Sequence, residues 1–140
     1  MIEVGVVNGP NLIGRAVLQA SDPSMGAAAG TFSPAPAYGD IAPYIQSLSR
    51  IAAYYPTLSL RARLARFFGR LRFGNRTLDL RVIRSDGVEL EPGAGITIVD
   101  LPDLDLRELW FDCRSGDIYR RYFEQDEVYR QYYSGSNPNV

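Results

Sequence analysis

The sequence contains no histidine and no lysine, so arginine supplies all fifteen of its basic side chains. Histidine is the commonest general base, the commonest metal ligand and the usual activator of serine or cysteine nucleophiles. Lysine forms Schiff bases and binds phosphate in P-loops. Because both residue types are missing, most of the usual routes to catalysis are closed. We expect no enzyme activity, no catalytic residue and no bound cofactor.

Cysteine and long apolar runs are also scarce. The single cysteine, Cys113, cannot form an internal disulfide bond, which agrees with a reducing compartment. Without a histidine to activate its thiol, we interpret Cys113 as a buried structural residue. No apolar run approaches the roughly 18 residues of a membrane span, and the N-terminus lacks a signal-peptide pattern. These absences predict a cytoplasmic protein that does not bind a membrane.

The length and composition are those of one globular domain. The chain has 140 residues, of which 46% are apolar and 22% are charged. We expect residues 1–133 to form a single globular domain. Residues 134–140 have the composition of a flexible C-terminal tail.

Most of the secondary structure predicted from the sequence is β. Apolar residues recur in residues 2–7 and 12–20, separated by the turn signal Asn8-Gly9-Pro10-Asn11, so a hairpin is expected there. Further strands are expected at 26–32, on both sides of the turn signal Asp86-Gly87, at 96–99 and at 104–112. Residues 92–95, Pro-Gly-Ala-Gly, are typical of a turn.

Two helices are expected beside these strands. Apolar residues spaced by three and four predict one helix over residues 41–54. Aromatic residues predict another over 118–133, and Ser115-Gly116-Asp117 is expected to form the turn that leads to its N-cap. Residues 57–73 fit a helix or a strand. The sequence therefore predicts the α+β class: a mostly antiparallel β-sheet covered by one or two helices.

The charges are sorted into two adjacent blocks of opposite sign. Between Arg61 and Arg84 there are eight arginines and one acid, Asp79, a net charge of +7. Between Asp86 and Asp112 there are eight acids and one base, Arg107, a net charge of −7. Such blocks can steer a charged macromolecule to one face. Alternatively, they lie on neighbouring strands and neutralise each other.

The acidic block is the candidate partner-binding site. Its densest part could supply oxygen ligands to calcium or magnesium, but it lacks the glycine and the spacing of an EF-hand loop. We therefore interpret it as a solvated strand face and expect no metal site. Tryptophan and tyrosine are typical of interface centres. The predicted contact residues are Asp100, Asp103, Asp105, Glu108, Trp110 and Asp112.

The function expected from this pattern is protein binding without catalysis. In size, charge pattern and β-rich layout, the chain resembles the small immunity proteins encoded beside bacterial toxins. That resemblance implies an antitoxin that blocks a toxin through an acidic surface. Two alternatives remain: a structural subunit of a phage virion or tail-like assembly, and a nucleic-acid-binding accessory domain that uses the Arg61–Arg84 block.

Overall fold

The computed structural model describes residues 1–53, 78–113 and 115–135. These residues form one sheet of seven strands in the order β5-β4-β1-β2-β3-β7-β6. Every pairing is antiparallel, which confirms the predicted α+β architecture. The strands are β1 (Ile2–Asn8), β2 (Asn11–Asp22), β3 (Ala27–Pro34), β4 (Leu80–Arg84), β5 (Glu89–Leu90), β6 (Pro92–Leu101) and β7 (Leu106–Cys113).

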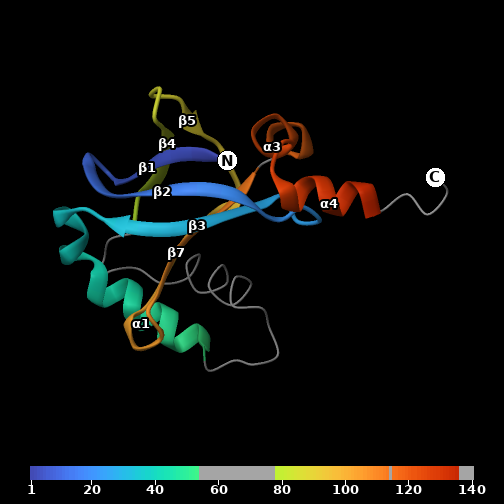
Figure 1. The fold of residues 1–140 in the computed structure, drawn as a ribbon. Coiled ribbons are helices and arrows are strands. Elements are labelled where there is room, and N and C mark those ends of the chain that lie inside the picture. The colour runs from blue at the N-terminus through green and yellow to red at the C-terminus, as the bar shows by residue number, and fades with distance from the viewer. Residues whose placement is uncertain (54–77, 114, 136–140) are drawn as a thin grey trace.

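Helices lie at both ends of the sheet. In the described ranges they are η1 (Pro36–Asp40), α1 (Ala42–Ala53), η2 (Pro102–Leu104), α3 (Gly116–Phe123) and α4 (Glu127–Gly135). Figure 1 shows α1 below one end of the sheet, and α3 and α4 at the opposite end near the N-terminus. The helix predicted over 41–54 is confirmed as α1, whereas the ambiguous segment 57–73 lies outside the described residues. None of the described helices combines the length and the apolar character needed to cross a membrane.

One face of the sheet carries the main hydrophobic core. Side chains alternate along β1 and β2, so that Val4, Val6 and Leu18 are almost fully buried while Val17 is exposed. Tyr38, from η1, and Tyr119, from α3, pack into the same cluster from the two ends. Burial of one large apolar side chain stabilises a fold by about 1.5–3 kcal/mol. The helices and the sheet therefore share one core and depend on each other.

Glycine allows β2 and β3 to approach unusually closely. The pairs Ala16↔Phe32 and Gln19↔Ala29 keep one register, but the ladder is interrupted between them. At this interruption a Cβ atom on Gly30 would lie 1.9 Å from the Val17 carbonyl oxygen. Only glycine fits such a contact, and the strand can bend there.

The predicted turns are partly confirmed. Gly9 and Gly87 both have positive φ angles, 56° and 89°, at the expected hairpins β1–β2 and β4–β5. The turn predicted at residues 92–95 is wrong, because these residues belong to β6. Pro92 opens the strand opposite Cys113, and a register shift follows before Ile96. An edge strand accepts a proline at its start, and a bulge absorbs the additional residues.

The C-terminal helix predicted over residues 118–133 is divided in two. Ser115 caps α3 through a hydrogen bond that its hydroxyl accepts from the Ile118 N–H, at 3.3 Å. The chain then turns before α4, and the Asp126 carboxylate accepts the backbone N–H of Ala20 at 2.8 Å. This contact with β2 orients α4 against the sheet. Helix α4 ends at Gly135, inside the segment expected to be a tail, and residues 136–140 lie outside the described residues.

Candidate functional site

The six predicted contact residues do not form one surface. Asp100, on β6, points towards α1 and is fully buried, and Asp112, on β7, is 8% exposed. Asp103 and Asp105 are exposed on the connection between β6 and β7, whereas Glu108 and Trp110 are half-buried on β7. The accessible part of the predicted site is therefore the connection and the outer face of β7.

The expectation of one continuous strand face is wrong for a local reason. Residues 102–104 form the η2 turn, and Asp105 adopts a left-handed conformation with φ 49°. Its N–H donates to the Pro102 carbonyl at 3.0 Å and closes the turn. Strand β7 begins only at Leu106, so Asp103 and Asp105 do not share a strand face. Leu104, between these two residues, is 70% exposed.

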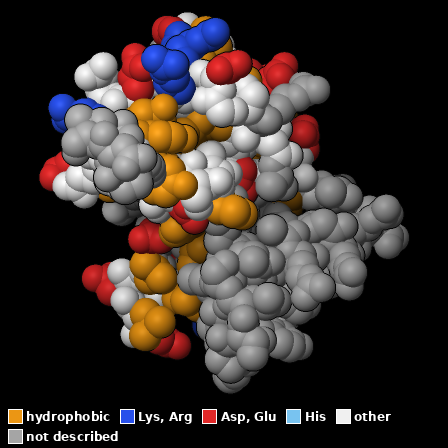
Figure 2. Space-filling view, turned by 90° about the vertical axis from the view of Figure 1, so that its right-hand side faces the viewer, with side chains coloured by type: hydrophobic (Ala, Val, Ile, Leu, Met, Phe, Trp, Pro, Cys, Tyr) orange, Lys and Arg blue, Asp and Glu red, His pale blue; other side chains and the backbone are white. Residues whose placement is uncertain are grey.

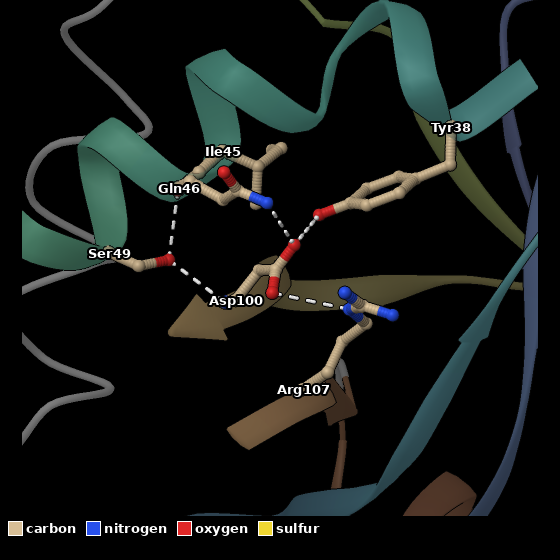
Figure 3. Close-up of polar contacts among 6 residues, drawn as sticks. All are labelled: Tyr38, Ile45, Gln46, Ser49, Asp100 and Arg107. Carbon is tan, nitrogen blue, oxygen red and sulfur yellow. Dashed lines mark hydrogen bonds and ion pairs between the residues drawn. The ribbon is translucent and has the colours of Figure 1, made fainter. Parts of the chain in front are cut away.

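A buried polar network surrounds Asp100 (Figure 3). Its carboxylate accepts hydrogen bonds from the Tyr38 hydroxyl at 2.8 Å and from the Gln46 amide at 3.1 Å. The Arg107 guanidinium forms an ion pair with the other carboxylate oxygen at 3.2 Å. The Ser49 hydroxyl accepts the Asp100 N–H at 3.0 Å and donates to the Ile45 carbonyl at 2.9 Å. A buried carboxylate needs this many partners, since an unpaired one is very costly.

The network connects four elements at the base of the η2 turn. Tyr38 belongs to η1, Gln46 and Ser49 to α1, Asp100 to β6, and Arg107 to β7. Burial raises the pKa of the Tyr38 hydroxyl, and its hydrogen bond to Asp100 raises this pKa further. The hydroxyl therefore stays protonated and keeps donating. We interpret the network as the anchor that holds the β6–β7 connection in place.

Part of the two charge blocks is neutralised within the β4–β5 hairpin. Arg81 forms an ion pair with Glu89 at 3.6 Å, and Arg84 pairs with Asp86. Hydrogen bonds from Arg84 lower the pKa of the Asp86 carboxyl to about 2. Figure 2 shows arginine and acidic side chains side by side at the height of this hairpin. Of these two pairs only Arg81–Glu89 joins neighbouring strands, as the cross-strand alternative expects, whereas Arg84–Asp86 lies within the hairpin turn. Residues 61–76 lie outside the described residues.

Two carboxylates of the acidic block keep their charge exposed. In the described part of the chain, neither the Asp103 nor the Asp105 carboxylate makes a hydrogen bond or an ion pair. They flank Leu104, whose side chain points into solvent. We call Asp103, Leu104 and Asp105 the acidic turn. The sequence indicated its charge, but Leu104 was missed because a leucine between strand residues is usually a core residue.

A pocket of about 710 Å³ opens on the outer face of the sheet. It lies over β1, β2, β3 and β7, at the interrupted part of the β2–β3 ladder. Its charged lining residues are Glu3, Arg15 and Glu108. Of these, only Glu108 was predicted, because nothing in the sequence distinguishes Glu3 or Arg15 from other exposed strand residues.

Trp110 packs against a small second hydrophobic cluster. It packs with Val99, Leu101 and Leu106, and its indole N–H donates to the Glu108 carboxylate at 3.0 Å. The side chain is therefore held in one orientation while remaining half-buried. This position suits a contact residue as well as a packing residue.

The surroundings of Cys113 do not activate its thiol. It is half-buried at the end of β7, and burial, with a smaller effect of Asp112, raises the pKa of its thiol to about 12. Thiolate is the nucleophilic form, so the native thiol is almost entirely unreactive near neutral pH. Within the described ranges, no three His, Cys, Asp or Glu side chains come together as a possible metal site.

Comparison with known proteins adds no assignment. No protein-family model, no curated protein and no solved structure matches the chain. The function is therefore argued from the side chains described above.

Proposed function

We propose that this chain is a non-catalytic protein-interaction module that binds a basic protein surface through the acidic turn and the adjacent outer face of β7. The observation that carries the proposal is the acidic turn itself. An exposed leucine stands between two carboxylates that have no partner in the described part of the chain. A large apolar side chain flanked by free charge is suited to a contact in which the leucine is buried and the carboxylates meet basic groups.

Preorganisation supports the same proposal. The turn is closed by its own backbone hydrogen bond, and its base is anchored by the Asp100 network. A contact segment that is already ordered loses little conformational entropy on binding, which favours affinity. The pair Asp103 and Asp105 would also accelerate association with a positively charged partner.

Within this class we propose the role of an immunity protein, which blocks a toxin by covering a basic surface. A toxin that cleaves nucleic acid needs a positively charged substrate surface, and a compact acidic turn is complementary to it. The absence of histidine and lysine and the unreactive thiol of Cys113 support a role without catalysis. The size and the β-rich layout of the chain agree with this role.

The test compares two variants that remove the same number of charges. Asp103→Asn with Leu104→Ala and Asp105→Asn alters the acidic turn. The control variant, Asp79→Asn with Glu127→Gln, also removes two exposed carboxylates. One directly precedes β4 and the other is on α4. Partners captured from the native host are purified, and binding is measured by surface plasmon resonance at several salt concentrations. We expect the turn variant to lose about tenfold or more in affinity and most of its salt dependence, and the control to bind normally.

The immunity role has its own readout. Co-expression of the unmodified chain with the captured partner should restore growth if the partner is toxic, and the turn variant should not. Normal binding by the turn variant would reject the acidic turn as the contact. If replacement of Arg61, Arg63 and Arg66 by glutamine then abolishes binding, the nucleic-acid or assembly alternative replaces this proposal.

A further inference from the structure

The outer-face pocket has features of a binding site that are separate from the acidic turn. Where the β2–β3 ladder is interrupted, Gly30 brings its backbone against Val17 and leaves no side chain above the strand. The resulting pocket of about 710 Å³ is open to solvent and has a floor of small residues, including Ala29 and Gly30. A side chain of a partner could enter over this floor, where no side chain projects from Gly30.

The charges around the pocket favour a cation. Glu3, on β1, and Glu108, on β7, contribute two carboxylates, while Arg15, on β2, contributes one guanidinium. In the described part of the chain, no ion pair joins Arg15 to either carboxylate. The carboxylates are therefore not neutralised from within, and the lining carries a net negative charge.

Trp110 adds a reason for a planar cation. It is the cross-strand partner of Ala29, which lines the pocket, so the two side chains lie on the same face of the sheet. Its indole N–H holds one oxygen of Glu108 at 3.0 Å and thereby fixes the carboxylate. A guanidinium can lie against an aromatic ring and donate hydrogen bonds to a carboxylate at the same time, which an ammonium does less well.

We propose that this pocket binds the guanidinium group of an arginine side chain presented by the partner. This inference deepens the proposed function and rests on it, because it names the group of the basic partner that the β7 face receives. Glu108 and Glu3 accept its hydrogen bonds, and Trp110 provides the flat wall. Arg15 opposes the incoming charge and moves aside into solvent, where it is already exposed.

The test uses a small probe, so that it does not depend on finding the partner. N-acetyl-arginine amide is titrated into the full ¹⁵N-labelled chain, and chemical shifts are followed by NMR. We expect saturable shifts at the amides of Val17, Gly30 and Thr31 and at the Trp110 indole. N-acetyl-lysine amide should bind more weakly, and inorganic phosphate should cause no shifts there.

Charge substitutions determine the sign of the ligand. Glu108→Gln retains an acceptor for the indole N–H and should weaken binding of the arginine probe about two- to fivefold, the size expected for one exposed ion pair. Glu3→Gln should act in the same direction, and Arg15→Gln should strengthen binding by a similar factor. Glu127→Gln, on α4, is the matched control and should change nothing.

Two outcomes would overturn the inference. One is the absence of saturable shifts at the pocket. The other is binding of phosphate that Arg15→Gln abolishes, which would make the pocket an anion site. Either result would leave the acidic turn untouched, because the turn variant is scored on the protein partner. Conversely, binding of the arginine probe would support the pocket as a guanidinium site even if the turn variant bound the protein partner normally.

Discussion

Asp100 and Asp103 have the same side chain three positions apart and opposite surroundings. Asp100 is fully buried and receives hydrogen bonds from Tyr38, Gln46 and Arg107, whereas Asp103 is exposed. We predict that Asp100→Ala lowers the free energy of unfolding by about 3 kcal/mol or more, because Arg107 and Tyr38 lose a shared partner. Asp103→Ala should stay within about 0.5 kcal/mol, as is usual for surface positions.

Urea unfolding followed by circular dichroism measures both variants in one experiment. Equal stabilities of the two variants would show that the Asp100 network does not anchor the fold. A large loss for Asp103→Ala alone would mean that the turn is structural and would weaken its assignment as a contact.

Cys113 gives a second prediction for a single residue. Burial raises the pKa of its thiol to about 12, so at pH 8 the native chain contains very little thiolate. Alkylation by iodoacetamide should therefore be at least about tenfold slower in the native chain than in urea, where the thiol returns to a pKa near 8.5. Mass spectrometry of timed samples gives both rates. Comparable rates would mean that the thiol is accessible and activated in the native fold.

Among the secondary-structure elements, the β-hairpins and α1 were predictable because their signals are local. Alternation in β1 and β2, and glycine at the positive φ angles of Gly9 and Gly87, require no knowledge of distant residues. The two faces of the β6–β7 hairpin were not predictable in this way. Side chains alternate between the two faces only within a continuous strand. The left-handed Asp105 reverses the chain, so the alternation does not continue from Asp100 to Glu108.

The candidate site followed the same rule. The excess of acid and the presence of Trp110 were visible in the sequence, but the burial of Asp100 depends on Tyr38, Gln46 and Ser49, which lie more than fifty residues earlier. The outer-face pocket depends on Gly30 and on strands that are distant in the chain. Both features arise from tertiary packing, which composition and spacing do not encode.

The close approach of β2 and β3 leads to a prediction about these strands. In Gly30→Ala the new Cβ would meet the Val17 carbonyl oxygen at 1.9 Å, so backbone must move. We predict a loss of about 1–3 kcal/mol in stability, the range for overpacked sites. Gly39→Ala, where no atom lies within 4 Å of the added Cβ, is the control and should be close to neutral. Similar urea midpoints for the two variants would contradict the close approach.

At the scale of the whole molecule, two tyrosines link the helices to one core. Tyr38 enters the core from η1, and Tyr119 enters from α3, where its hydroxyl donates to the Ala27 carbonyl at 2.9 Å. Both side chains are almost fully buried. Since they belong to the same cluster, opening either end exposes the other, and the described part of the chain should unfold cooperatively.

This shared core predicts a loss of stability at alkaline pH. Burial raises the pKa of both hydroxyls above the ordinary tyrosine value of 10.0, with Asp100 adding to the effect at Tyr38. Below pH 10 both states hold these protons, so stability does not change on their account. Above pH 10 only the unfolded chain releases them, so each tyrosine lowers the free energy of unfolding by about 1.4 kcal/mol per pH unit.

Urea midpoints between pH 8 and 11.5, with absorbance at 295 nm, measure the effect. Tyr119→Phe removes one of the two ionising hydroxyls. The loss of unfolding free energy per pH unit that Tyr38 and Tyr119 cause together should therefore fall by about half. If every tyrosine ionised near pH 10 while the circular dichroism stayed native, the two hydroxyls would not be buried in one core.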